Sequence, residues 1–253
     1  MNKTPKISLK NVSFAYGENN KILNEISLEI HTGECVCFLG GNGSGKTTLL
    51  KIIAGLLAPT SGQVMLEGKP IGEARKSEVC YVFQEAEFQI VASTVEEDVA
   101  FGAENLCLPT GEIEERVATS LDAVGLTHKR TSDVECLSGG QKSCLVLAGM
   151  LAMKPSVILL DDATCHLDSR GRERLEEVLQ KLKAEGKTII SAEYSLGKTE
   201  NCDRVFVLQG GAIVAEKSRE KIKAMTDGEL AELGFFRKSN LLCDELQGEV
   251  PWR

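Results

Sequence analysis

The chain carries the sequence Gly40-Gly41-Asn42-Gly43-Ser44-Gly45-Lys46-Thr47, which matches the pattern G-x-x-x-x-G-K-[ST]. Residues 34–39, directly before it, are almost continuously apolar, as is typical of a strand that is buried on both faces. Residues 46–57 have a helical composition that stops before Pro59. The sequence therefore predicts a strand, a glycine loop and a helix. This is the structural context that the pattern needs in order to act as a binding loop.

The chemistry of this loop is phosphate binding. Its glycines let backbone N–H groups converge on phosphate oxygens, and the dipole of the following helix adds to the attraction. Lys46 reaches the β and γ phosphates of a nucleoside triphosphate, and the Thr47 hydroxyl is a ligand for Mg²⁺. We therefore expect residues 40–47, with Thr48 beside them, to bind ATP and Mg²⁺. The alternative is a glycine-rich turn without a ligand, and the flanking strand and helix argue against it.

Further strands are expected on both sides of this unit. Apolar residues spaced mainly by two predict two antiparallel strands at 7–16 and 23–30, with a bulge near Lys10 and Asn11. Short apolar runs predict strands at 64–66, 79–83, 157–160, 188–190 and 205–208. Residues 93–153 have helical periodicity, a second amphipathic helix ends at Gly186, and Gly210-Gly211 is typical of a hairpin turn. This alternation predicts an α/β fold with a parallel sheet and right-handed crossovers.

A carboxylate follows the predicted strand at 157–160. Asp161 stands at its carboxyl end, the edge at which open α/β sheets bind ligands. We expect Asp161 to hold Mg²⁺ through water. An apolar strand that ends in Asp is common, so this prediction depends on the phosphate loop that precedes it.

The composition narrows the class of protein. The 253 residues are 42% hydrophobic and 26% charged, which excludes a disordered chain. The formal net charge of −8 argues against electrostatic binding to the phosphate backbone of a nucleic acid, so no nucleic-acid partner is expected. The longest mostly apolar run, 145–153, is far shorter than the roughly 20 residues that span a bilayer. We therefore expect a soluble protein of the cytosol, where its nine cysteines stay reduced.

The segment Leu137-Ser138-Gly139-Gly140-Gln141 is the most specific feature of the sequence. With it, residues 7–216 resemble the ATP-binding subunits of ABC transporters. The resemblance implies a P-loop NTPase core with a mixed sheet, an N-terminal antiparallel β-subdomain and an inserted helical subdomain at about 93–153. Residues 1–216 would form the nucleotide-binding domain and 217–253 a short C-terminal extension.

The resemblance also implies how the site is assembled. In this family two ATP-binding domains pair head to tail, so that each ATP lies between the phosphate loop of one chain and the Leu-Ser-Gly-Gly-Gln signature of the other. Tyr16 would stack on adenine, Gln84 would contact Mg²⁺ and the attacking water, and Asp168 would lie in a loop that crosses the interface. For Tyr16, a core or edge-strand aromatic remains the alternative.

A narrower resemblance covers Tyr81-Val82-Phe83-Gln84, Gln89-Ile90-Val91 and residues 94–106. These segments are similar to the energy-coupling-factor (ECF) ATPases, which power bacterial uptake of vitamins and of cobalt or nickel ions. This implies three partners: a second ABC ATPase subunit, a transmembrane coupling protein and a substrate-binding membrane component. It also implies a peripheral location on the cytoplasmic face of the membrane, with a groove after Gln84 that receives a helix of the coupling protein.

Of the positions that depart from the family's pattern, two bear on catalysis. Asp162 follows Asp161 where competent members carry Glu, the general base or water-positioning residue. Because Asp is one methylene shorter than Glu, its carboxylate ends roughly 1.3 to 1.5 Å farther from the attacking water. A general base must come within about 2.6 to 3.2 Å of that water. Tyr194 stands where a histidine normally contacts the γ-phosphate, and it lacks the paired nitrogens of imidazole. Asp162, Gln84 and Tyr194 are therefore the candidate catalytic residues, with slow chemistry expected.

The two departures affect cleavage rather than binding, which suggests an asymmetric pair. In that hypothesis this subunit binds ATP for a long time at its own phosphate loop. Its signature completes the ATP site of a different, competent subunit. The alternative is a homodimer that hydrolyses slowly through Asp162. Two other classes remain open: a soluble ABC protein of DNA repair, translation or iron-sulfur assembly, and a noncatalytic regulatory subunit. The chain lacks the long coiled coils of repair ATPases and the tandem domains of translation factors.

Overall fold

The N-terminal half begins with an antiparallel sheet. In this computed structural model, which describes residues 4–17, 20–73, 77–163, 167, 169–196, 199 and 201–232, the strand order of that sheet is β2-β1-β4-β5. The strands are β1 (Ile7–Ala15), β2 (Lys21–Ile30), β4 (Ser61–Leu66) and β5 (Lys69–Pro70). The pairing of β1 shifts register between Leu9 and Val12, and Asn11 has a φ of 50° there. The predicted bulge is therefore confirmed.

A second sheet has six strands in the order β10-β9-β3-β8-β7-β6. They are β3 (Cys35–Leu39), β6 (Val79–Val82), β7 (Val157–Asp161), β8 (Thr188–Glu193), β9 (Arg204–Gln209) and β10 (Ala212–Ser218). All neighbours are parallel except β9 and β10, which form the hairpin predicted at Gly210-Gly211. Strands β3, β7 and β8 are buried along their whole length, and the sequences of β3 and β7 are accordingly almost continuous apolar runs.

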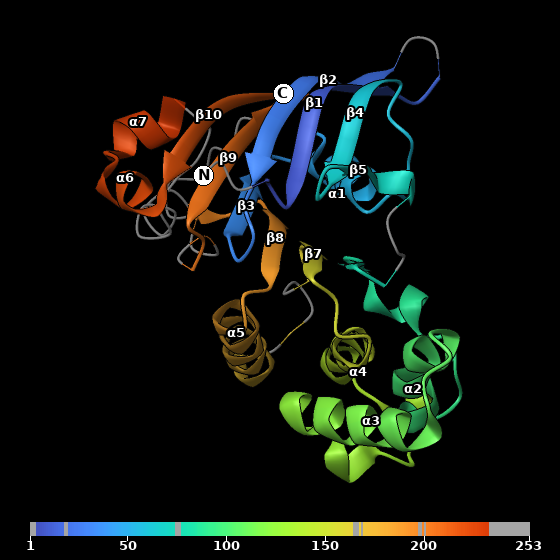
Figure 1. Ribbon diagram of the computed structural model, residues 1–253. Helices are drawn as coiled ribbons and strands as arrows, with labels where there is room; N and C mark the ends of the chain where they lie inside the picture. The colour runs from blue at the N-terminus through green and yellow to red at the C-terminus, as the bar shows by residue number, and fades with distance from the viewer. Residues whose placement is uncertain are drawn as a thin grey trace.

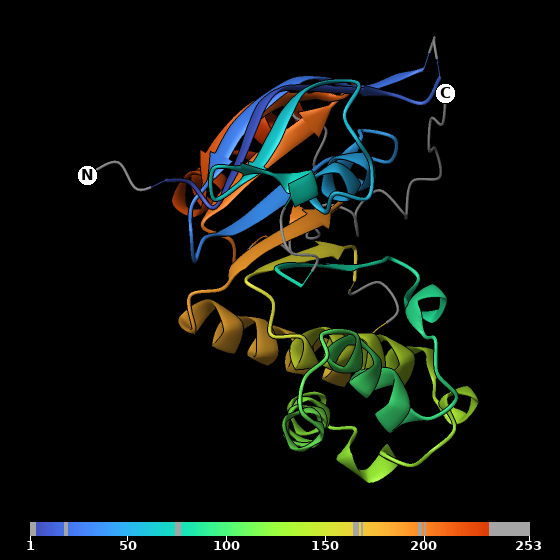
Figure 2. The ribbon, with the colours of Figure 1, turned by 45° about the vertical axis from the view of Figure 1, so that its right-hand side comes forward.

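Helix α1 (Lys46–Ile53) lies between the two sheets (Figure 1; Figure 2). The predicted helix ran to residue 57, and its end was wrong. Gly55 adopts a φ of 72°, and the N–H of Leu56 donates to the carbonyl of Lys51 at 2.9 Å. This pairing closes the helix end in a Schellman motif, which needs a left-handed residue just past the last turn.

Four longer helices cover the opposite face of the six-stranded sheet (Figure 1). They are α2 (Val95–Asn105), α3 (Thr110–Val124), α4 (Gly139–Ala152) and α5 (Ser169–Ala184). Helices α4 and α5 lie directly under the sheet, and α2 and α3 pack on α4. Two short helices, α6 (Arg219–Ala224) and α7 (Asp227–Glu232), follow β10. Among the described residues, none of the helices combines the length and apolar character needed to cross a bilayer.

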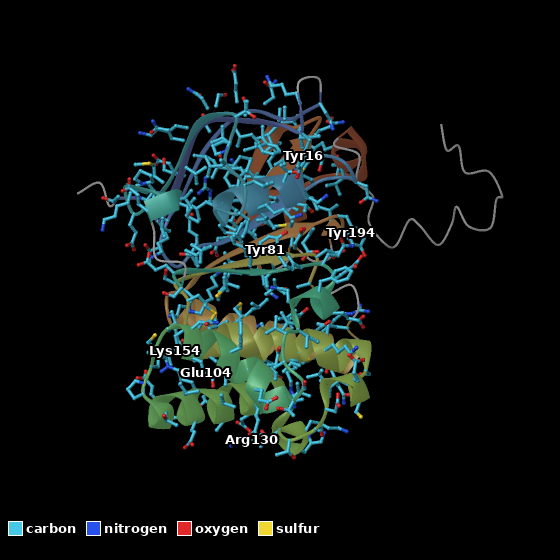
Figure 3. All side chains as sticks on the ribbon, turned by 90° about the vertical axis from the view of Figure 1, so that its right-hand side faces the viewer. Tyr16, Tyr81, Glu104, Arg130, Lys154 and Tyr194 are labelled. Carbon is cyan, nitrogen blue, oxygen red and sulfur yellow. The ribbon has the colours of Figure 1, made fainter. Side chains whose placement is uncertain are left out.

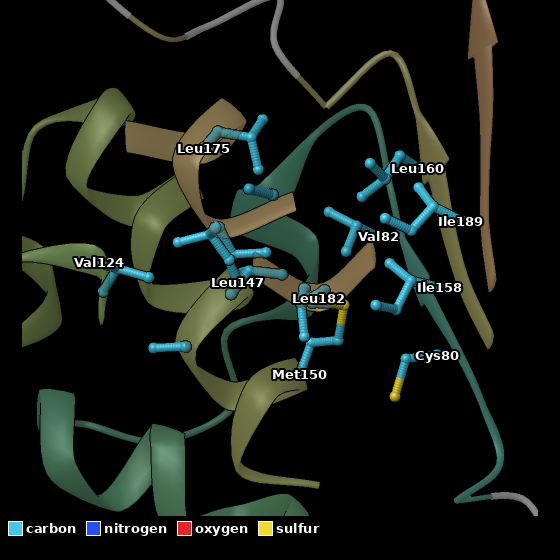
Figure 4. Packing of buried hydrophobic residues seen from close by; sticks show 14 of the residues in the cluster. Cys80, Val82, Val124, Leu147, Met150, Ile158, Leu160, Leu175, Leu182 and Ile189 are labelled. Carbon is cyan, nitrogen blue, oxygen red and sulfur yellow. The ribbon is translucent and has the colours of Figure 1, made fainter. Parts of the chain in front are cut away.

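The hydrophobic core has two parts, one on each face of the six-stranded sheet. The first lies between the sheets and contains Phe38, Leu49 and Phe206, each almost fully buried. The second packs the sheet on the helices, and Figure 4 shows Leu147 and Met150 of α4 facing Ile158 and Leu160 of β7. The two parts of the core together hold β3, β7 and β8 in place. The loop of residues 40–47 begins at the carboxyl end of β3, beside the carboxyl ends of β7 and β8.

Candidate nucleotide site

The phosphate loop connects β3 to α1. Gly45 has a φ of 102°, and a Cβ built on it would lie 2.7 Å from Leu23 Cδ2, so only glycine fits there. Gly40 is held by a bond from its N–H to the Glu193 carbonyl at 3.2 Å. The first turn of α1 has neither a side-chain cap nor an acidic residue. Its backbone N–H groups and dipole therefore form an N-terminus suited to an anion.

Lys46 lies inside this loop. Its Nζ donates to the carbonyls of Gly40 and Gly41 at 2.8 and 2.9 Å. Burial lowers the pKa of the Lys46 ammonium, and the carboxylates of Asp161 and Asp162 oppose that shift. The ammonium is thus a donor held over the loop, where a phosphate oxygen can replace a carbonyl as its partner.

Asp161 is buried at the end of β7 and both of its oxygens accept hydrogen bonds. Thr47 Oγ1 donates to Oδ1 at 3.0 Å, and the Tyr81 hydroxyl donates to Oδ2 at 2.6 Å. Burial, followed by this bond to Asp161, raises the pKa of the Tyr81 hydroxyl, so the phenol keeps its proton. The hydroxyl of Thr47 and the carboxylate of Asp161 are the kind of oxygen ligands that Mg²⁺ prefers.

Lys46, Thr47 and Asp161 line one cavity of about 270 Å³. Its walls come from the loop, from the ends of β7 and β8 and from the segment after β6. The lining residues are Ile22, Asn42, Gly43, Gly45, Lys46, Thr47, Thr48, Gln84, Asp161, Asp162, Ala192, Glu193 and Tyr194. Most of the residues predicted for ATP, Mg²⁺ and catalysis are thus brought together, although their sequence positions span more than 150 residues.

The two departures from the family's pattern both face this cavity. Asp162 adopts a φ of 47°, a left-handed conformation that is uncommon for a residue other than glycine, and its N–H donates to the Ala192 carbonyl at 3.2 Å. Tyr194 follows β8 directly and is 52% exposed. Gln84 is exposed at the other side of the cavity.

Four residues predicted to bind ATP lie outside the cavity lining, namely Tyr16, Gly40, Gly41 and Ser44, and one predicted interface residue lies outside the described residues. Tyr16 is 49% exposed at the end of β1, where its ring meets the Phe14 ring edge-on at 4.8 Å. In Figure 3 Tyr16 and Tyr194 lie toward the same side of the molecule. Ser44 does not line the cavity, and its buried Oγ has no hydrogen-bond partner among the described residues. Asp168 lies outside the described residues.

The signature residues form the start of α4, in the helical part of the molecule. Ser138 is the N-cap: its Oγ accepts from the Gln141 N–H at 3.3 Å, and its own N–H donates to Gln141 Oε1 at 3.0 Å. Leu137 is buried and anchors the turn, whereas Ser138 and Gly139 are exposed and Gly140 is partly exposed. This surface does not share the cavity of the phosphate loop, so a second molecule must supply it if the two are to meet around one ligand.

Sequence reasoning missed two residues of the site. Tyr81 was predicted as part of a strand and of the segment that carries the narrower resemblance, but not as a site residue, although it contacts Asp161. Glu193 is a buried acid that lines the cavity at the last position of β8, and the predicted strand stopped at residue 190. A polar residue at the carboxyl end of a buried strand is the signal that would have identified Glu193.

A larger groove of about 700 Å³ lies beside this site, between the segment after α1, β6, α2 and α4. Its lining is mostly apolar, and Leu56, Val91 and Phe101 expose 56%, 60% and 48% of their surface there. Asp98, at the start of α2, accepts from the N–H groups of Val91 and Ala92 at 2.8 and 3.2 Å. The loop that forms one rim of the groove is therefore held in place.

The chain is similar to ATP-binding proteins of transporters. A sequence model of the family described as ABC transporter matches residues 23–165. The energy-coupling factor transporter ATP-binding protein EcfA1 of Streptococcus mutans is 40% identical over 236 residues, which cover 90% of this chain and 84% of that protein. The corresponding EcfA of Methanosarcina acetivorans is 38% identical over 255 residues, which cover 97% and 92%.

Solved structures of transporter ATP-binding proteins are also similar to this chain. The cbiO1 structure from Clostridium perfringens, described as part of the ABC transporter complex cbiONQ, has a TM-score of 0.79 at 34% identity, covering 87% of this chain and 91% of that one. The dimeric ATP-binding cassette MJ0796, bound to ADP and phosphate, has a TM-score of 0.76 at 28% identity, covering 84% and 98%. These similarities confirm the predicted fold.

Proposed function

The chain belongs to the ABC transporter family of ATP-binding proteins, and from this membership we propose that it is the ATP-binding subunit of an ECF-type importer. It is an ATPase whose binding and hydrolysis of ATP move a transmembrane partner. The observation that carries this proposal is the single cavity in which the phosphate loop lies with Gln84, Asp161 and Asp162. A peripheral position on the cytoplasmic face of the membrane follows from that role.

ATP and Mg²⁺ fit the residues of the cavity. The uncapped start of α1 and the Lys46 ammonium would hold the phosphates, while Thr47 and Asp161, with Gln84 nearby, would hold Mg²⁺. Mg²⁺ when bound neutralises charge on the β and γ phosphates. Asp162 would orient the attacking water and accept its proton, and Tyr194 would face the γ-phosphate.

We infer that the complete site needs a second ATPase subunit. Phosphates bind well at helix N-termini, and the exposed start of α4 is such an end, with Ser138 and the Gly139 backbone directed outward. Facing the loop of another subunit, it would cover that subunit's γ-phosphate. Asp168 and Tyr16 would complete the interface loop and the adenine contact.

The pair is asymmetric in this proposal. A shorter carboxylate at 162 and a phenol at 194 leave phosphate binding intact but weaken water activation. This subunit would retain its ATP and supply its signature to a competent partner chain. The transmembrane coupling protein would insert a helix into the apolar groove, and a separate membrane component would bind the transported substrate.

Turnover measurements test this proposal. We expect the isolated chain to retain ATP in equilibrium dialysis with Mg²⁺, and Lys46→Ala to abolish that retention. Steady-state hydrolysis by the chain alone should be slow, and Asp162→Glu should raise it by on the order of 10-fold or more, because a well-placed base contributes 10² to 10⁴. Fast turnover by the unmodified chain would contradict asymmetry, and absence of ATP retention would contradict the function as a whole.

A further inference from the structure

The carboxylate of Asp161 is held from two sides. Thr47 Oγ1, from α1, donates to Oδ1 at 3.0 Å, and the Tyr81 hydroxyl, from β6, donates to Oδ2 at 2.6 Å. Rotation of the carboxylate about its χ2 angle would break both bonds. The orientation of Asp161 is therefore set jointly by a helix and by a neighbouring strand.

The pairing of β6 with β7 brings Tyr81 to this place. Tyr81 is paired in register with Leu159, two residues before Asp161. Because side chains alternate along a strand, Leu159 and Asp161 project from the same face of the sheet. Leu159 belongs to the core between the two sheets, and Tyr81 packs against that core. The long phenol therefore reaches forward along that face, and its hydroxyl ends at Asp161.

The backbone and ring of Tyr81 are fixed independently of its hydroxyl. Gln89 Nε2 donates to the Tyr81 carbonyl at 2.8 Å, and Gln89 Oε1 accepts from the Phe83 N–H at 2.7 Å. The rings of Tyr81 and Phe83 meet edge-on at 4.8 Å. Removal of the hydroxyl alone should consequently leave the ring where it is and release only one side of Asp161.

We propose that Tyr81 is a positioning residue that orients Asp161, together with Thr47, toward the Mg²⁺ of bound ATP. The inference rests on the proposed function, since it takes Mg²⁺–ATP as the ligand. Outer hydrogen bonds to metal-holding groups typically change metal affinity by 10- to 100-fold. The substitution Tyr81→Phe should therefore weaken the contribution of Mg²⁺ to ATP binding and leave the metal-free contribution of the phosphate loop unchanged.

The test compares ATP binding with Mg²⁺ and with EDTA in the full chain. For each protein, the dissociation constant in EDTA is divided by the dissociation constant with Mg²⁺, and this ratio measures how much the metal strengthens ATP binding. We expect Tyr81→Phe to lower this ratio by about 10-fold or more and to leave the dissociation constant in EDTA unchanged. Electron paramagnetic resonance of Mn²⁺–ATP should also change in Tyr81→Phe, because the environment of the bound metal changes.

Ser156→Ala is the matched control. Ser156 Oγ donates to the Glu78 carbonyl at 3.1 Å and joins the opposite ends of the same two strands. We expect its ratio to equal that of the unmodified chain. An unchanged ratio in Tyr81→Phe, an equal loss in Ser156→Ala, or equal weakening with Mg²⁺ and with EDTA would each overturn the inference. An unmodified chain that binds ATP equally with and without Mg²⁺ would overturn the proposed metal site itself.

Discussion

At the scale of single residues, the site combines local pattern with contacts that no local pattern reveals. Lys46 and Thr47 were predictable because one short loop and the helix after it contain all that phosphate binding needs. Tyr81 was not, because its contact with Asp161 depends on how β6 pairs with β7 across 80 residues of sequence. A shift of one residue in that pairing would turn the phenol to the other face of the sheet.

The partly buried ammonium of Lys46 should make ATP binding depend on pH. Burial lowers its pKa, and only the protonated form attracts phosphate. We expect the affinity for ATP to fall as pH rises through that lowered pKa, below the range in which an exposed lysine loses its proton. Calorimetric titrations between about pH 7 and 10.5 would measure this. Lys46→Arg should remove the alkaline decline, since arginine stays protonated, and a decline that persists in that variant would assign it to another group.

At the scale of elements, strand and helix types were predictable and their ends were less so. Residues 46–57 have a helical composition overall, yet α1 ends at Ile53 because Gly55 adopts a left-handed conformation just beyond it. Glycine tolerates helix interiors and helix ends, so its presence alone did not decide between them. The burial of β8 as far as Glu193 was missed for a related reason, because Ser191 and Glu193 interrupt the apolar run that indicates a buried strand.

The end of α3 provides a test of such a closure. Gly125 caps α3 with a φ of 71°, and a Cβ there would collide with the guanidinium of Arg174, which donates to the Val124 carbonyl at 3.3 Å. We expect Gly125→Ala to lower the free energy of unfolding by roughly 1 to 2 kcal/mol, through left-handed strain and loss of that bond. Chemical denaturation would measure it. Gly111→Ala, in the first turn of the same helix with open space around it, should be neutral or slightly stabilising, and equal losses in the two variants would refute this account.

At the scale of the whole molecule, the phosphate loop and the signature, which we propose to enclose one ATP between two subunits, do not share a cavity within one chain. The phosphate loop lies at the carboxyl end of β3 and the signature begins α4 in the helical part, so in the proposed pair each would face its complement on a second subunit. Sequence motifs point to both segments but contain no information on whether the proposed second subunit is the same chain. That choice depends on surface complementarity across a whole face, which short motifs do not encode.

The apolar groove between β6 and α4 should determine attachment to the membrane partner. A charge at Phe101 would have to be buried without a counterion when an apolar helix binds, which is costly. We therefore expect Phe101→Glu to lose co-purification with membrane proteins after mild detergent extraction while ATP binding stays unchanged. Val214→Glu is the control, because Val214 on β10 is equally exposed, 49% against 48%, but does not line the groove. Retention of the membrane partner by Phe101→Glu, or its loss in both variants, would show that attachment does not depend on this groove.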